Sequence, residues 1–152
     1  MVAFLNTVDV DEQTDVLDHD DTWLSWLAEA GLPGPAGQSA TAVRRHRSKA
    51  RVMRDDLRMV AAGEDCAVRQ FPLVLTVDGC EPRLGGSDPL EEIMGAVARL
   101  GVLGELARVK ICPADDCRWA FYDSSRNGSR QWCSMAVCGN RAKARAHRAR
   151  QG

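Results

Sequence analysis

The sequence lacks the long apolar runs and terminal signals that mark membrane and secreted proteins. No stretch of about 18 apolar residues exists, so no segment is long enough to cross a bilayer. Residues 1–10 show no basic flank followed by a long apolar stretch, which argues against a secretory signal. We therefore expect a cytoplasmic protein that contacts no membrane.

Residues typical of catalytic sites are also scarce. The three histidines, His19, His46 and His147, are scattered along the chain. Neither a glycine-rich phosphate loop nor a nucleophile elbow occurs. We expect that the protein is not an enzyme.

Charge is segregated along the chain, although the formal net charge is only −1. Residues 1–22 contain seven acids and neither lysine nor arginine, whereas residues 108–152 contain ten bases and three acids. The acidic segment from Asp9 to Asp21 would either fold back on the basic tail and compete with a nucleic acid there, or simply remain solvated.

Capping signals and apolar periodicity predict a small α+β domain of three helices and one β-hairpin. Asp88, Pro89 and Glu91 form a capping sequence, and Asp78-Gly79 is typical of a two-residue hairpin turn. In chain order we expect a helix over 22–30, a break at 32–37, a helix over 39–62, strands over 71–77 and 80–84, and a helix from 89 to about 106.

Four arginines share one stripe of the helix predicted over 39–62. They are Arg47, Arg51, Arg54 and Arg58. Such a ladder would suit phosphate groups, but arginine stems also cover apolar edges while their charged heads stay in water. We favour the second interpretation.

Four of the six cysteines form two pairs with equal spacing, separated by fifteen residues. They are Cys112, Cys117, Cys133 and Cys138. Four thiolates suit one tetrahedral, structural Zn²⁺ ion, with no open position for water. Unrelated thiols or two disulfides are the less favoured alternatives in a reducing compartment. Cys66 and Cys80 lie outside these pairs, and we expect them to be ordinary buried residues.

The segment between the cysteine pairs predicts two short strands, over 118–122 and 130–132, around a turn at Asn127-Gly128. Its aromatic residues would form a small apolar shell around the ion, although packing alone also explains most of them. They are Trp119, Phe121, Tyr122 and Trp132.

Directly after Cys138 the chain becomes rich in alanine and arginine, which predicts a helix over 141–150. A narrow alanine strip (Ala142, Ala146, Ala149) would lie on the protein, and basic residues would project elsewhere. The alternative is a frayed, solvated tail. The candidate nucleic-acid contacts are Arg126, Arg130, Arg141, Lys143, Arg145, Arg148 and Arg150.

The run from Phe121 to Met135, followed by Cys138-Gly139-Asn140-Arg141, closely resembles the CGNR zinc-finger family of bacterial stress-induced transcription regulators. Upstream, the sequence resembles that family's N-terminal ABATE domain. The residues that carry this second resemblance are Phe4-Leu5-Asn6-Thr7, Trp26-Leu27 with Gly31-Leu32, and the hairpin before the last helix of the N-terminal domain. The resemblance implies that the four paired cysteines bind zinc and that the finger binds DNA.

These observations predict an α+β protein of two domains. Residues 1–108 would form an ABATE-like domain for sensing or dimerisation, and residues 109–152 a treble-clef or ribbon-like zinc finger that ends in a basic helix. The expected function is transcription regulation on double-stranded DNA, with base readout by Arg141 or Arg145. A homodimer and a small-molecule effector are further options. The alternative is a zinc-stabilised module that binds RNA or protein.

Overall fold

The computed structural model describes residues 1–36 and 39–151, and one long helix organises this part of the chain. Gly37 of the predicted break and Gly152 at the end of the predicted finger lie outside the described residues. The helices are α1 (Val2–Leu5), α2 (Asp20–Glu29), α3 (Ala40–Ala62), α4 (Pro89–Val102) and α5 (Asn140–Ala149), with short helical turns η1 (Val16–Asp18), η2 (Leu106–Arg108) and η3 (Met135–Gly139). The strands are β1 (Val8–Asp9), β2 (Thr14–Asp15), β3 (Leu75–Asp78), β4 (Glu81–Leu84), β5 (Val109–Ile111) and β6 (Ala120–Tyr122). The α+β prediction is confirmed.

The two longest helices begin within about one residue of the positions predicted from the sequence. Ser39 Oγ accepts the N–H of Ala42 at the start of α3, and Gly63 ends that helix with a φ of 72°. Asp88 opens α4 with the expected capping box. The prediction for the end of α4 was wrong, because the helix stops at Val102 and the chain then turns into η2. None of the described helices is long and apolar enough to span a membrane.

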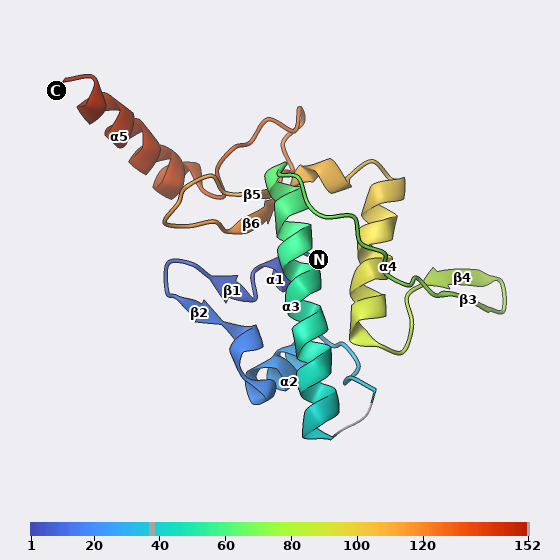
Figure 1. The fold of residues 1–152 in the computed structure, drawn as a ribbon. Helices are drawn as coiled ribbons and strands as arrows, with labels where there is room; N and C mark the ends of the chain where they lie inside the picture. The colour runs from blue at the N-terminus through green and yellow to red at the C-terminus, as the bar shows by residue number, and fades with distance from the viewer. Residues whose placement is uncertain (37–38, 152) are drawn as a thin grey trace.

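The main core surrounds α3, which stands between α4 and the N-terminal segments (Figure 1). Trp23 of α2 is fully buried in this core. Strands β5 and β6 join it through Val109, Ile111 and Ala120. The core therefore extends into the predicted finger. The domain boundary at 108/109 stays a prediction.

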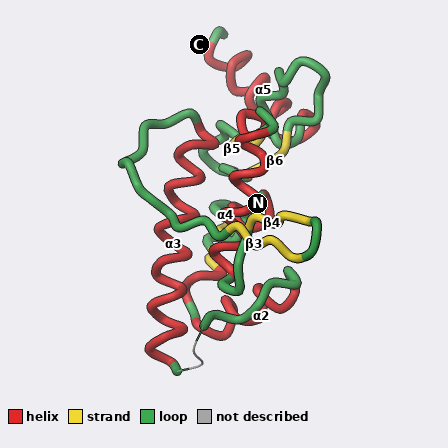
Figure 2. Tube along the Cα trace, turned by 90° about the vertical axis from the view of Figure 1, so that its right-hand side faces the viewer, coloured by secondary structure: helices red, strands yellow, loops and turns green. Residues whose placement is uncertain are grey.

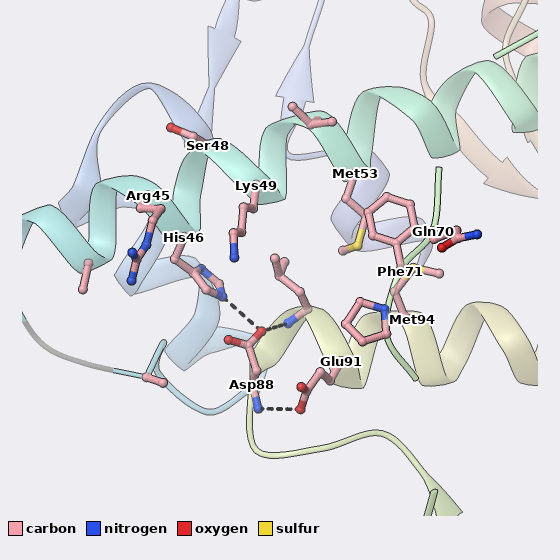
Figure 3. Close-up of a pocket in the computed structure, with 15 residues that line it drawn as sticks. Arg45, His46, Ser48, Lys49, Met53, Gln70, Phe71, Asp88, Glu91 and Met94 are labelled. Atoms are coloured by element: carbon pink, nitrogen blue, oxygen red, sulfur yellow. Dashed lines mark hydrogen bonds and ion pairs between the residues drawn. The ribbon is translucent and has the colours of Figure 1, made fainter. Parts of the chain in front are cut away.

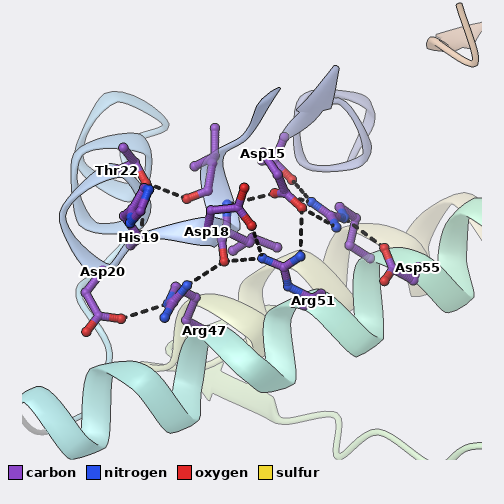
Figure 4. Close-up of polar contacts among 12 residues, drawn as sticks. Asp15, Asp18, His19, Asp20, Thr22, Arg47, Arg51 and Asp55 are labelled. Atoms are coloured by element: carbon purple, nitrogen blue, oxygen red, sulfur yellow. Dashed lines mark hydrogen bonds and ion pairs between the residues drawn. The ribbon is translucent and has the colours of Figure 1, made fainter. Parts of the chain in front are cut away.

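The acidic N-terminal segment binds the arginine stripe of α3 (Figure 4). Arg54, whose side chain is 3% exposed, bonds Asp15 at 2.6 Å, while Arg47 bonds Asp20 at 2.7 Å and Arg51 bonds Asp18 at 2.9 Å. Further along, Arg58 donates to the carbonyl of Leu5. The expectation of solvated arginine heads was wrong, because carboxylates and carbonyls of residues 5–20 bind them. The pairing also leaves no role for these arginines as a phosphate ladder.

The predicted hairpin forms between β3 and β4, but its turn is shifted by one residue, and the first strand begins at Leu75 instead of Phe71. Asp78 pairs with Glu81, so the two turn residues are Gly79 and Cys80. Gly79, with a φ of 62°, supplies the positive φ that this turn needs. Figure 2 shows the hairpin beside α4, with strands in yellow. Both Cys66 and Cys80 are exposed, which contradicts their predicted burial, because they lie in loops away from the core.

Candidate metal centre and basic helix

The sulfur atoms of the four paired cysteines converge and lie within 4.8 Å of one another. Cys133 Sγ lies 3.5 Å from Cys117 Sγ and 3.7 Å from Cys138 Sγ. A tetrahedral Zn²⁺ ion with Zn–S bonds of about 2.3 Å separates its sulfurs by about 3.8 Å, so this donor set fits the ion. The alternative of two disulfides is not found, since a disulfide needs about 2.05 Å between sulfurs and all four thiols are free.

The first cysteine pair is positioned by the β5–β6 hairpin. Strand β5 pairs antiparallel with β6, and Cys112 directly follows β5. Its N–H donates to the carbonyl of Trp119 at 2.9 Å. The turn between the pair is closed by bonds from Cys117 and Arg118 to the carbonyl of Ala114, and Arg118 adopts a φ of 53°. The strand pairing therefore places both cysteines in the loop that joins β5 to β6.

The second pair is joined directly to the basic helix. Cys138 lies within η3, where the N–H of Gly139 bonds the carbonyl of Ser134 five residues earlier at 3.1 Å. Ser134 Oγ also accepts the N–H of Val137. Helix α5 begins at Asn140, two residues after the last sulfur ligand. An ion held here would fix the direction of α5.

The loop between the pairs is organised by Asp123, which sequence analysis did not single out. Its buried carboxylate accepts Lys110 Nζ at 2.7 Å and the backbone N–H groups of Ser125 and Arg130, each at 2.9 Å. The hydrogen bond from Lys110, with those from the two N–H groups, holds the pKa of Asp123 far below its usual range. The Asp123-Ser-Ser sequence is typical of an Asx turn, and that signal could have revealed this role.

The predicted strand over 130–132 was wrong, because β6 pairs with β5 and not with the segment after the loop. The backbone N–H of Arg130 is already bonded to Asp123. Its guanidinium lies 4.9 Å from the centre of the Phe121 ring and bonds the carbonyls of Trp132 and Cys133. Arg130 therefore braces the loop that carries Cys133.

Two of the four aromatic residues form the predicted shell. Phe121 is buried beside Cys112 and Ala114, and Trp132 packs against this cluster. Trp119 and Tyr122, by contrast, are exposed. The local core of the finger is therefore small, which is typical of modules that a metal ion stabilises.

The thiols differ in their acidity. Burial raises the pKa of Cys117 and, more strongly, that of Cys133. Burial also acts to raise the pKa of Cys138, but hydrogen bonds from Arg141 and from the neighbouring cysteines outweigh it, so this pKa is lowered. Cys138 lies two residues before the start of α5, where the helix dipole favours a thiolate.

Arg141 connects the sulfur cluster to the loop of the first cysteine pair. Its Nη2 lies 3.5 Å from Cys138 Sγ, and its Nη1 lies 3.1 Å from Asp116 Oδ2. Asp116 also faces Arg145 Nη1 at 3.6 Å. The Cys138 thiolate and Asp116 raise the pKa of Arg141. Arg141 is thus half-buried and held by the finger itself.

The other predicted nucleic-acid contacts are exposed, and α5 itself extends away from the rest of the described chain (Figure 1). Ala142 is half-buried, but Ala146 and Ala149 are exposed, so the expected alanine strip does not lie on the protein. Among the described residues, no ion pair involves the side chains of Arg126, Lys143, Arg148 and Arg150.

A small β-hairpin, four converging thiols and a following helix define this part of the chain as a zinc-finger-like metal-binding module. Residues 108–151 match the family model of the CGNR zinc finger. The family implies zinc as the metal. No curated protein matches the chain. The ABATE-like interpretation of the upstream residues stays a prediction.

Proposed function

We propose that the protein is a DNA-binding transcription regulator in which one structural zinc ion, held by Cys112, Cys117, Cys133 and Cys138, presents α5 to duplex DNA. The observation that carries the proposal is the attachment of an exposed basic helix directly to the metal centre. The ion supplies folding energy and direction to the finger. Four thiolates leave no position for a reacting water, so the proposal includes no catalysis.

The shape of α5 suits the major groove. Its ten residues give a rod of about 15 Å, and a groove about 12 Å wide admits such a helix. The helix extends into solvent, so a duplex can approach it without meeting the core (Figure 1).

The charged side chains of α5 have separate roles in this proposal. Lys143 and Arg148 are exposed and suited to phosphates, as is Arg150 just beyond the helix. Arg145, which is 51% exposed and only loosely paired with Asp116, is the better candidate for reading a guanine edge. Arg141 serves the finger instead, because Cys138 and Asp116 hold its guanidinium.

Residues outside α5 contribute less directly. Arg126 is exposed in the loop after Asp123 and would meet a phosphate beside the groove. Arg130 would support the loop. A single module of this size covers little DNA, so we include a homodimer, which would add a second half-site. We place the protein in the cytoplasm, where thiols stay reduced.

The salt dependence of duplex binding tests the proposal. Fluorescence anisotropy of labelled duplex DNA, measured across a range of salt concentrations, gives a slope of log affinity against log salt. Replacing Lys143, Arg148 or Arg150 by alanine should weaken binding and flatten the slope by roughly 0.9 for each lost phosphate contact. Arg44→Ala is the matched control, because this arginine is exposed at the distant end of α3.

Each outcome decides between the proposed function and its alternative. Equal effects of the α5 variants and of Arg44→Ala would reject α5 as the docking surface. If the protein binds single-stranded or duplex RNA of the same sequence more tightly than duplex DNA, the RNA-binding alternative is favoured. Selection of bound sequences from a random duplex pool, with and without Arg145, then tests base readout.

A further inference from the structure

A cavity of about 720 Å³ lies far from the metal centre, between α3, α4 and the coil that connects α3 to β3 (Figure 3). Small-molecule sites in proteins have volumes of about 300–1,000 Å³. The cavity is thus large enough to enclose a compact organic molecule.

The wall of this cavity is mainly apolar. Met53 of α3 is fully buried at its base, and Leu90 and Met94 of α4 are half-buried opposite it. Phe71, from the connecting coil, covers one side. Methionine side chains adapt to the shape of a bound group, and an aromatic ring adds a flat contact surface.

Two cations stand over this apolar wall. Arg45 and Lys49 are exposed, lie one helical turn apart on α3, and extend toward α4 (Figure 3). Within the described part of the chain, neither side chain forms an ion pair. This contrasts with Arg47, Arg51 and Arg54 on the other face, all of which bind acids. Helix α3 therefore has one neutralised face and one face with available positive charge.

The acidic side chains in the cavity wall are already engaged. Asp88 Oδ1 accepts the N–H of Leu90 at 2.8 Å and faces His46 Nε2 at 3.2 Å. The Trp23 indole can only donate, so its bond to His46 Nδ1 places the ring proton on Nε2, toward Asp88. Glu91 accepts the N–H of Asp88 at 3.4 Å. These acids hold the start of α4 and do not neutralise Arg45 or Lys49.

We propose that this cavity binds a small amphipathic organic anion. Its carboxylate would meet Lys49 and Arg45, and its apolar body would lie between Met53, Phe71 and Met94. An apolar wall with a few converging polar groups is the usual composition of a small-molecule site. The inference goes beyond the proposed function and does not depend on it, since neither the finger nor DNA takes part.

Binding of 2-naphthoate to the full-length, zinc-loaded protein tests the site. Isothermal titration calorimetry should show one site per chain, with the carboxylate binding about tenfold more tightly than the neutral isostere 2-naphthamide. Lys49→Ala, alone or with Arg45→Ala, should remove this preference and leave the affinity for the amide unchanged. Arg44→Ala, an exposed neighbour outside the cavity wall, should keep the preference.

A second variant tests the position of the site. Val52 lines the cavity and is 43% exposed, so Val52→Trp should fill the mouth of the cavity without disturbing the core. Near-ultraviolet circular dichroism checks that the fold is intact, and loss of binding by both naphthalene compounds then supports the proposal. Equal affinity for acid and amide, or binding that survives Val52→Trp in a folded protein, overturns it.

Discussion

Among single residues, Asp15 and Arg54 form the most enclosed ion pair between the acidic segment and α3. The guanidinium of Arg54 is 3% exposed and bonds both oxygens of Asp15, at 2.6 and 2.9 Å. Removing one partner of a buried pair leaves an uncompensated charge, which costs about 3–5 kcal/mol. This pair therefore holds β2 and η1 against α3.

Asp15→Asn should lower the free energy of unfolding by about 3 kcal/mol, because the buried Arg54 would lose the enclosed carboxylate that bonds two of its nitrogens and keep only the exposed Asp55. Urea denaturation followed by tryptophan fluorescence measures this change. Asp18→Asn is the control, since Asp18 is 54% exposed and its pair with Arg51 should contribute less than about 1 kcal/mol. Equal losses of unfolding free energy in Asp15→Asn and Asp18→Asn would contradict a larger contribution of the enclosed pair.

The same pair predicts a pH dependence. Burial alone would raise the pKa of Asp15, but the hydrogen bonds and charge of Arg54 outweigh it and lower this pKa in the folded state. The ionised carboxylate therefore stabilises the fold above the unfolded pKa of about 3.9, and this stabilisation disappears as the pH falls through the lower folded value. The stability difference between wild type and Asp15→Asn should be constant near neutral pH and shrink below about pH 4. A difference that persists unchanged into that acidic range would contradict this.

Arg141 should act on metal affinity through Cys138. Its guanidinium donates to the sulfur and bonds Asp116, so Arg141→Ala should weaken zinc retention about tenfold, as loss of an outer-shell partner commonly does. Competition with a chromogenic chelator measures the affinity, and Arg141→Lys should restore part of it. Arg148→Ala, on the same helix and away from the sulfurs, should leave it unchanged. Equal zinc affinity in wild type and Arg141→Ala would exclude this positioning role.

At the scale of helices and strands, elements with local sequence signals were predicted well. Strands that depend on pairing with distant residues were not. Helices α3 and α4 carry their own caps, at Ser39 and Asp88, so their starts could be read from the sequence. Strand β6 could not be paired in this way. Its partner β5 lies before Cys112, and nothing local distinguishes that pairing from one with residues after the loop. The carboxylate of Asp123 settles the choice by binding backbone groups of the loop.

The packing of α4 on β4 depends on Gly95. A Cβ atom there would lie 2.4 Å from the carbonyl oxygen of Leu84, which belongs to the backbone and cannot easily move. Gly95→Ala should therefore destabilise the protein by about 1–3 kcal/mol through overpacking, although alanine favours a helix by about 1 kcal/mol. Gly101→Ala in the same helix is the control, because no atom lies within 4 Å of its added Cβ. That variant should be neutral or slightly stabilising in thermal denaturation. A Gly95→Ala variant as stable as Gly101→Ala would contradict the close contact.

On the scale of the whole molecule, the cysteine spacing predicted the metal centre because each pair of ligands is close in sequence. Charge gave less information. The sequence showed an acidic start and a basic end, but it did not show that the arginines of α3 bind the acidic start. Those arginines bind Asp15, Asp18 and Asp20, so three of the seven acids in this segment are paired within the fold. The extension of the core into β5 and β6 was also hidden, since it depends on contacts between distant residues.

These contacts predict how far the molecule unfolds when zinc is removed. Strand β6 is held by Asn6, whose side chain exchanges hydrogen bonds of 2.9 and 2.7 Å with Ala120, and by the main core. In the described structure, the segment from the loop after Asp123 to α5 packs only on the small cluster around Phe121, and a few hydrogen bonds from Lys110 and to Asp123 hold its loop. A chelator should therefore unfold that segment and leave the helical core around Trp23 intact.

Hydrogen exchange measures this difference directly. The amides of α5 and η3 should lose protection in chelator and regain it when Zn²⁺ is added back, whereas those of α3 should keep it. Duplex binding should be lost in the same step if α5 docks on DNA, since an unfolded tail no longer aligns its cations. Loss of protection in α3 as well would mean that the bonds between Asn6 and Ala120 couple the finger and the core into one cooperative unit.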